Sequence, residues 1–332
     1  MSRIKSVAIT TLILMIGSLS GCGSTNESST GSSASTSESV TTPKTVKSCN
    51  QEIVLNSTPQ KVVSLGVTGL AYLVAAGAEQ HIIARANEFD EPPAAWIGTR
   101  ADNIKVLSGD LSLEGLVGLD PDLAYGGGFS PTNLTPTQVT EKKIPAVVDN
   151  PECHYFYPDV PENESFDNIL SEITELGQLL NTSSEADKTV QELKDQIDTI
   201  KKENLGQGRS VSYAYYFGED TELFSYGQKG VMGEINDTLG IHSAIDPNYH
   251  PHQGPIAPEA FVKSDPDMIV ILEGMGGATK ESTLDRLKEI PGYSEMKAVK
   301  NNQIFFIESA AAYASPGAIY GMIELADQIK KN

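Results

Sequence analysis

The stretch 182–204, TSSEADKTVQELKDQIDTIKKEN, is predicted to form one uninterrupted helix. Thr182 and Glu185 have the spacing of a capping box at its start, and Gly206 is placed to end it in a left-handed conformation. About 22 residues at 1.5 Å each give roughly 33 Å, about the width of a small domain. Apolar residues recur at intervals of four and three and form one narrow stripe: Ala186, Val190, Leu193, Ile197 and Ile200. A long helix that is packed along one face predicts a strut between two lobes, with a surface helix of a single domain as the alternative.

Strands alternate with helices on both sides of this helix, as in parallel sheets that are covered by helices. The stretch from Leu113 to Gly128, LEGLVGLDPDLAYGGG, and the stretch from Pro258 to Gly274, PEAFVKSDPDMIVILEG, share one order. Each has an acidic helix, Asp-Pro-Asp, a strand and a Gly-rich loop, which indicates one supersecondary unit repeated in each half. The prediction is an α/β fold of two Rossmann-like lobes with central, mostly parallel sheets, joined by one long interlobe helix. A ligand would then bind in a cleft at the carboxyl ends of the strands.

The amino terminus is typical of a lipoprotein signal peptide, predicted for residues 1–21. Two positive charges precede a short apolar core, Val7 to Ile16, which is too short for a stable membrane span. Leu19 to Cys22 (LSGC) resembles a lipobox, so we expect cleavage before Cys22 and attachment of lipid to its thiol. A plain cleaved signal peptide is the alternative. The expected location is extracytoplasmic, lipid-anchored to the cell membrane.

The domain organisation follows from composition. Residues 22–47 are rich in Ser and Thr and contain no aromatic residue, which predicts a flexible tether. The remaining boundaries are an amino-terminal α/β lobe at 48–181, the interlobe helix at 182–204 and a carboxy-terminal α/β lobe at 205–332.

The net charge limits the classes of binding partner, and the cysteine count indicates a disulfide. The net charge is −20 and the isoelectric point is near 4.6, which excludes nucleic acid as a favoured partner and weighs mildly against a strongly anionic ligand. With Cys22 lipidated, Cys49 and Cys153 remain in an exported protein and are expected to form a disulfide. Two free thiols are the alternative.

Enzyme motifs are missing from the sequence. It contains no G-x-S-x-G, no H-E-x-x-H and no Walker loop, so we expect a binding protein with no catalytic residues. A metal-dependent surface enzyme and a signalling receptor on the same lobes remain as alternatives.

Four stretches, in this order, resemble the substrate-binding lipoproteins of ABC importers for iron–siderophore complexes, haem or cobalamin. They are TPQKVVSLGVTGLAYLVAAGA (58–78), LSLEGLVGLDPDLAYGG (111–127), the helix from Ile169 to Leu180 with the strut, and APEAFVKSDPDMIVIL (257–272). The resemblance covers nearly all of the chain from Cys49 to Lys330 and implies two α/β lobes with little closure on binding. Cys49 and Cys153 also match the positions of the cysteines in the iron-complex group.

The resemblance implies a function and partners. The chain would capture an iron complex, a ferric siderophore or haem, in the interlobe cleft and deliver it to the permease and ATPase subunits of an importer. Cobalamin or another corrinoid is the alternative ligand, no cofactor is required, and the protein would act as a monomer. Family members dock on the permease through one glutamate per lobe, which by motif are Glu114 in SLEGL and Glu259 in APEAF.

The expected ligand site gathers aromatic and polar residues near the predicted strand ends. Aromatic side chains at a cleft mouth suit a large, flat or apolar ligand. The candidates are Thr68, Asn87, Phe89, Trp96, Phe129, Tyr215, Tyr216, Tyr226, His250, His252, Glu273 and Tyr313. Trp96 is expected on a loop at the rim because it follows Pro92-Pro93. Core packing of Tyr215 and Phe217 is the alternative for that strand.

A metal role is a further hypothesis. His250 and His252 point the same way in an extended segment and could reach one ion, with a further ligand from His154, His242 or Glu273. A surface loop is the alternative. Few basic residues fall on the expected cleft loops, namely Arg85, Arg100 and Lys229. This favours a neutral ligand such as a corrinoid, or a haem ligated by Tyr or His.

Overall fold

The computed structural model describes residues 43–218, 221–245 and 252–332. The predicted signal peptide, the predicted lipidation site Cys22 and His250 lie outside the described residues. Within those residues no helix combines the length and apolarity needed to cross a bilayer.

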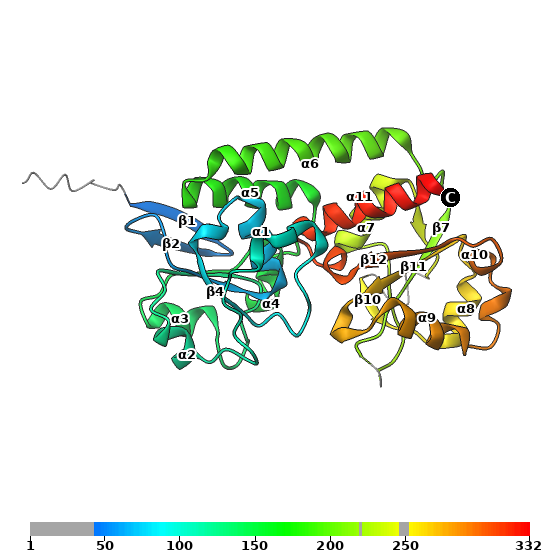
Figure 1. Cartoon of the computed structure of the whole chain (residues 1–332), viewed down its shortest axis with the longest axis horizontal. Helices are drawn as coiled ribbons and strands as arrows, with labels where there is room; N and C mark the ends of the chain where they lie inside the picture. Colours follow the sequence, from blue (N-terminus) through cyan, green and yellow to red (C-terminus); the bar gives the residue numbers. More distant parts are fainter. Residues whose placement is uncertain (1–42, 219–220, 246–251) are drawn as a thin grey trace, which may run out of the picture. The chain divides into compact units, whose positions relative to one another are not determined.

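The amino-terminal lobe is built on a parallel sheet in the order β4-β3-β5-β6. Its strands are β3 (Val62–Leu65), β4 (Ile82–Ala86), β5 (Leu123–Gly126) and β6 (Ala146–Val147). The helices are α1 (Gly66–Ala75), α2 (Leu113–Gly118), α3 (Pro136–Glu141), α4 (Cys153–Phe156) and α5 (Phe166–Leu180) (Figure 1). Every residue of β3 and β5 is buried, as expected for a parallel sheet that is covered on both faces.

The carboxy-terminal lobe has a second parallel sheet, in the order β12-β11-β7-β9. Its strands are β7 (Ser210–Ala214), β9 (His242–Ser243), β11 (Met268–Glu273) and β12 (Ile304–Glu308). The helices are α7 (Gly230–Leu239), α8 (Pro258–Ser264), α9 (Lys280–Lys288), α10 (Lys297–Lys300) and α11 (Pro316–Lys331). A short antiparallel pair, β8 (Phe224–Tyr226) with β10 (Gln253–Pro255), accompanies the sheet. The predicted α/β fold with mostly parallel sheets is confirmed.

The predicted strut is α6 (Ser183–Glu203), which runs alongside helices of both lobes (Figure 1). Ala186, Leu193 and Ile200 are buried, and Val190 and Ile197 pack beside them. The helix contacts α1 and α5 of the amino-terminal lobe and α7 and α11 of the carboxy-terminal lobe. The prediction that one face of this helix is packed against two lobes is therefore confirmed.

At both ends of α6 the observed capping differs from the prediction. The side chain of Thr182 makes no capping hydrogen bond. Glu185 packs over Gly77, where a Cβ would lie 2.5 Å from the Cβ of Glu185. At the other end the left-handed residue is Asn204, with φ 47°, and not Gly206. A Cβ on Gly206 would lie 2.2 Å from Ile241 Cγ2, so this glycine permits close packing instead of ending the helix.

The predicted tether is too long at its carboxyl end. Residues 44–47 belong to strand β1 (Lys44–Ser48), which pairs with β2 (Gln51–Leu55) as a hairpin. The strand was missed because its side chains alternate between partly buried and exposed and carry two lysines. The expected disulfide between Cys49 and Cys153 is present, with the two Cα atoms 5.3 Å apart, and it ties the hairpin to α4.

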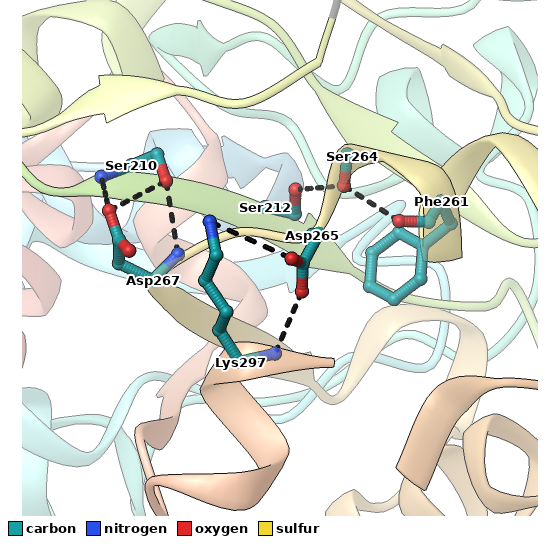
Figure 2. A network of polar contacts seen from close by, with 7 residues as sticks. All are labelled: Ser210, Ser212, Phe261, Ser264, Asp265, Asp267 and Lys297. Atoms are coloured by element: carbon teal, nitrogen blue, oxygen red, sulfur yellow. Dashed lines mark hydrogen bonds and ion pairs between the residues drawn. The ribbon is translucent and has the colours of Figure 1, made fainter. Parts of the chain in front are cut away.

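The two Asp-Pro-Asp turns have the same role in both lobes. Both carboxylate oxygens of Asp122 accept backbone N–H groups at the start of β3, from Gln60 and Lys61 at 2.8 Å each. In the other lobe, Asp267 Oδ2 accepts the backbone N–H and the hydroxyl of Ser210, at the start of β7, at 2.9 Å each (Figure 2). Each turn thus ties its own strand to the neighbouring strand, which confirms the repeated unit.

The first aspartate of each turn is also equivalent. Asp120 and Asp265 both adopt the left-handed conformation, with φ of 50° and 38°. Each pairs with a lysine, Asp120 with Lys61 at 2.5 Å and Asp265 with Lys297 at 3.6 Å. Figure 2 shows Lys297 reaching Asp265 with both its backbone N–H and its ammonium group. These turns set where the strands begin, and hence where the loops at their carboxyl ends fall.

Candidate functional site

A cavity of about 670 Å³ lies between residues of the two lobes. The amino-terminal lobe contributes Gly127 and Phe129, which follow β5, and residues from Glu152 onward, which follow β6. The carboxy-terminal lobe contributes Met275 after β11 and Tyr313 after β12. The full lining is Gly127, Phe129, Pro131, Glu152, His154, Tyr155, Phe156, Glu162, Glu164, Phe217, Tyr226, Lys229, Val231, Met232, His252, Gln253, Met275, Ala312, Tyr313 and Ala314. The cavity therefore lies at the carboxyl ends of strands from both sheets, as the repeated unit predicts.

Two acidic side chains of the cavity join the lobes. Glu162 Oε2 lies 2.9 Å from His252 Nε2. Glu164 Oε2 accepts the backbone N–H of Val231, in the first turn of α7, at 3.0 Å. A carboxylate at this position is stabilised by the partial positive charge of a helix amino terminus. Both glutamates come from the loop before α5, so this loop contacts the opposite lobe at the cavity.

A third acidic residue, Glu152, faces the cavity from the short helix η3 (Asn150–Glu152). Its side chain lies against the loop after β5, since a Cβ on Gly127 would lie 2.5 Å from Glu152 Cγ. Burial raises the pKa of Glu152 well above its ordinary value, and the negative charges of Asp149 and Glu164 raise it further.

Two more carboxyl groups lie behind this wall, fully inside the lobe. Asp149 accepts the hydroxyl of Thr68 at 2.8 Å, and burial raises its pKa to about 7. Glu172 accepts the hydroxyl of Tyr125 at 2.9 Å and a hydrogen bond from the side chain of Asn150. Burial, reinforced by Asp149, raises the pKa of Glu172 to about 8. The interior beside the cavity is therefore unusually rich in carboxyl groups.

Aromatic rings make up much of the remaining cavity surface. Tyr313 donates a hydrogen bond to Glu91 Oε1 at 2.6 Å, and Ser309 donates to Glu91 Oε2 at 2.9 Å. A buried glutamate of the amino-terminal lobe thus orients a cavity tyrosine of the other lobe. The other rings of the lining are Phe129, Tyr155, Phe156, Phe217 and Tyr226. A largely aromatic surface with a few polar groups is typical of small-molecule sites.

Four of the predicted ligand-binding residues line this cavity: Phe129, Tyr226, His252 and Tyr313. Their contact with a ligand stays a prediction. His250 lies outside the described residues, so its predicted place at the site is not described.

Two predicted polar residues have structural roles instead. Thr68 is buried in α1, where its hydroxyl bonds Asp149. Asn87 is a left-handed residue with φ 56°, whose side chain donates to Gly128 O and accepts from Leu111 N, each at 2.8 Å. Thr68 lies in the first turn of α1 and Asn87 directly follows β4, and the polar atoms of both hold neighbouring loops.

Three predicted aromatic residues also lie away from the cavity lining. Phe89 is 69% exposed on the surface. Trp96 stacks on Tyr320 of α11, with ring centroids 4.3 Å apart and an interplanar angle of 12°. Trp96 is therefore packed against a helix and does not sit at the rim. Tyr215 is fully buried in the core, as the alternative predicts. The alternative is wrong for Phe217, which is 42% exposed and lines the cavity.

Tyr216 and Glu273 belong to other surfaces. The guanidinium of Arg286 lies 3.5 Å from the ring centroid of Tyr216, which follows β7 and packs in a different core cluster from Tyr215. Glu273, at the end of β11, lines a separate hollow with Glu308. Alternation along a strand sends neighbouring side chains to opposite faces, so Tyr215 and Tyr216 could not both reach one site.

Several cavity residues were missed by sequence reasoning. They lie in a stretch with no strand or helix signal: Glu152, Tyr155, Phe156, Glu162 and Glu164. The aromatic run HYFY that directly follows Cys153 is the signal that could have found them. A disulfide that closes next to four consecutive aromatic residues holds them near the carboxyl ends of the sheet.

The described residues form no ready-made metal site. In the described ranges, no three His, Cys, Asp or Glu side chains converge so that they could hold an ion. His252 pairs with Glu162, and His154 Nδ1 lies 2.9 Å from the carbonyl oxygen of Pro151. That carbonyl can only accept, so Nδ1 of His154 carries its proton. The pairing of His250 with His252 on one ion stays a hypothesis.

The two predicted docking glutamates occupy equivalent exposed positions. Glu114 lies in the first turn of α2 and Glu259 in the first turn of α8. Both helices lead into an Asp-Pro-Asp turn, so the two residues occur at matching points of the repeated unit.

Comparisons with known proteins agree with this architecture. Residues 62–311 match the family model described as periplasmic binding protein. The chain is 22% identical over 324 residues to an uncharacterized ABC transporter substrate-binding lipoprotein, YvrC of Bacillus subtilis, covering 96% of this chain and 95% of that protein. It is also 22% identical over 324 residues to the petrobactin-binding protein YclQ of Bacillus subtilis, covering 94% of this chain and 93% of that protein.

A solved structure with a similar fold is titled as an ABC-type Fe³⁺-hydroxamate transport system from Saccharomonospora viridis. The TM-score is 0.70 at 20% identity, and the match covers 86% of this chain and 98% of that chain. Both lobes are included in a match of this extent.

The buried carboxyl groups predict that stability falls as the pH rises. The pKa of Glu172 is raised from 4.5 to about 8, so its contribution is fully present below the unfolded-state value and is lost as pH rises through 8. Between about pH 5 and about pH 8.5 we expect a loss of a few kcal/mol in the free energy of unfolding. Glu172→Gln should remove part of this loss, measured by urea unfolding at both pH values. The exposed Glu192→Gln on α6 is the control, and an equal pH slope in wild type and Glu172→Gln would contradict the prediction.

Proposed function

Because the chain belongs to the periplasmic binding protein family, we propose that it is the extracytoplasmic substrate-binding component of an ABC importer. It captures an iron complex, a ferric siderophore or haem, in the interlobe cavity and delivers it to the permease and ATPase subunits. The observation that carries the proposal is the aromatic cavity of about 670 Å³ at the strand ends of both lobes. Its volume falls within the range of roughly 300–1,000 Å³ that holds small-molecule ligands.

The relatives support iron as the cargo. YclQ is named for petrobactin, and the similar solved structure is titled for Fe³⁺-hydroxamate transport. The protein acts by binding and release as a monomer, without a resident cofactor and without turnover. A corrinoid is the alternative cargo, and it would be recognised by its own absorption bands in the experiment below.

In this proposal the aromatic residues pack on the ligand and the lobes change their spacing little. Tyr313 is held by Glu91, and Glu164 and Glu162 contact the opposite lobe across the cavity. The interlobe helix α6 packs on helices of both lobes, which restrains their relative movement. Recognition then depends on side chains that are positioned before the ligand arrives.

Ligand capture is tested by titrating the full chain, purified in detergent, with ferric siderophores, haem and cobalamin. Retention after gel filtration and the absorption spectrum identify the cargo, and calorimetry gives the affinity. Phe217→Ala should weaken binding about tenfold, since Phe217 is a ring of the cavity lining. The control is Phe89→Ala, which removes an exposed ring outside the lining. A protein that retains no iron complex would refute the proposed cargo.

Docking through the two exposed glutamates predicts a separation of binding from transport. We expect Glu114→Arg and Glu259→Arg to abolish uptake of the labelled iron complex in cells, because each replaces an acceptor for permease arginines by a like charge. Affinity for the ligand should stay unchanged, since neither residue lines the cavity. Glu141→Arg, at the end of α3, is the matched charge reversal. Unimpaired uptake by both variants would exclude this docking mode.

Anchoring is proposed to occur through lipid on Cys22, which follows the predicted signal peptide. Cys22→Ser should move the protein from the membrane fraction to the soluble extracytoplasmic fraction, measured by fractionation and immunoblotting. Loss of incorporated labelled palmitate should accompany the change. Membrane retention of Cys22→Ser at the wild-type level would argue against lipid at this site.

A further inference from the structure

The charge of the cavity lining is negative. Glu152, Glu162 and Glu164 contribute three carboxyl groups, whereas Lys229 is the one lysine or arginine among the described lining residues. The two internal segments outside the described ranges, 219–220 and 246–251, contain no lysine or arginine in their sequence. They therefore add no lysine or arginine to the internal part of the chain.

The arginines that could neutralise an anionic ligand are used elsewhere. Arg85 pairs with Glu88 at 2.6 Å, with both side chains largely buried. Arg100 lies over the ring of Trp96, 5.3 Å from its centroid, and donates to backbone carbonyl groups. Arg286 lies on Tyr216 and donates to the carbonyl oxygens of a neighbouring loop. None of the three lines the cavity.

Glu152 is the cavity glutamate for which the described residues supply no compensating charge. Glu162 has His252 as a partner, and Glu164 has the amino terminus of α7. Among the described residues, no lysine or arginine forms an ion pair with Glu152, and its charged neighbours are the carboxyl groups of Asp149 and Glu164. Burial and these two carboxyl groups disfavour the charged form of Glu152 and raise its pKa. A cationic group seated against Glu152 would stabilise the carboxylate and offset both effects, because the attraction between opposite charges is strong in a partly buried site.

The aromatic rings of the cavity also favour a positively charged ligand. Tyr155, Tyr226 and Tyr313 line the cavity together with Glu152. Aromatic faces attract cations by roughly 0.5–2 kcal/mol each, and the effect grows when water is excluded. Carboxyl groups and aromatic faces are thus two independent features that select a positively charged ligand.

We propose that the captured iron complex carries a net positive charge, with an ammonium group seated against Glu152 and the iron chelate packed against the aromatic rings. This inference rests on the proposed function and specifies the substrate class of that site. Three hydroxamate groups neutralise ferric iron, so a trihydroxamate with one amine tail forms a cationic complex. A tris-catecholate complex is anionic, and haem carries two carboxylates. Such ligands would place negative charge beside three glutamates, which costs affinity.

The test uses three ferric trihydroxamates with the same iron coordination and different tails. The tails are a free ammonium group, its acetylated neutral form and its succinylated anionic form. Calorimetry on the full chain should give the order cationic, neutral, anionic, with about tenfold between neighbouring members, as expected for one charged contact. The differences should shrink at high salt, because the attraction is electrostatic.

The variant Glu152→Gln tests whether the ammonium group of the ligand binds at Glu152. It should weaken the cationic complex about tenfold and leave the neutral complex unchanged, whereas the exposed Glu141→Gln should alter neither. A melting temperature close to that of the wild type shows that Glu152→Gln is folded. The charge series on the wild-type protein tests the charge selection even if the variant does not fold.

Each outcome bears on a separate claim. Equal or tighter binding of the anionic complex would overturn the charge selection while the proposed function stands. Binding of haem or a tris-catecholate complex, with no hydroxamate bound, would have the same meaning. Charge selection that survives Glu152→Gln would overturn the assignment to Glu152. If no iron complex binds at all, the proposed function itself fails.

Discussion

The packing of one apolar stripe on α6 against helices of both lobes is the constraint on which the rest of the structure depends. Leu193 and Ile200 are buried, and each such side chain contributes about 1.5–3 kcal/mol. The same apolar core continues through Tyr72 of α1 and Met322 of α11, so the two lobes share one layer of helices. The hydroxyl of Tyr72 also donates to the carbonyl oxygen of Ala314, beside the cavity, at 3.0 Å. The cavity walls are therefore held by the same packing that joins the lobes.

The two Asp-Pro-Asp turns determine which loops lie next to each other at the cavity. Asp122 and Asp267 each bind the backbone at the start of a neighbouring strand, which sets the register of β5 beside β3 and of β11 beside β7. Because parallel strands end at one edge of the sheet, the loops that follow β5 and β11 both face the cavity. The pKa of Asp267 is lowered chiefly by the backbone N–H of Ser210, so the turn keeps its charged acceptor over a wide pH range.

The electrostatics of the cavity follow from how carboxyl groups are used. Glu91, Glu162 and Glu164 each accept hydrogen bonds or an ion pair from the opposite lobe, so they serve the contact between lobes. Within the part of the chain that the structure describes, Glu152 has no such partner, and it lies next to the buried Asp149. An acidic chain with a pI near 4.6 thus has an acidic binding cavity as well. Solubility explains surface acidity, but it does not explain an uncompensated carboxyl group beside aromatic rings in a cavity.

The sequence by itself determined the fold class, the interlobe helix, the repeated Asp-Pro-Asp unit and the pairing of Cys49 with Cys153. The first three depend on periodicity or on short-range order that a single chain displays directly. The disulfide followed from the number of cysteines in an exported chain, since only two remain after Cys22. The sequence also predicted that Phe129, Tyr226 and Tyr313 lie near strand ends, where the cavity is found. Only the tertiary structure decided that Trp96 packs on α11 and that the loop with Glu152 faces the cavity. These positions depend on contacts between distant segments, and a loop without periodicity carries no local signal for the partner it will meet.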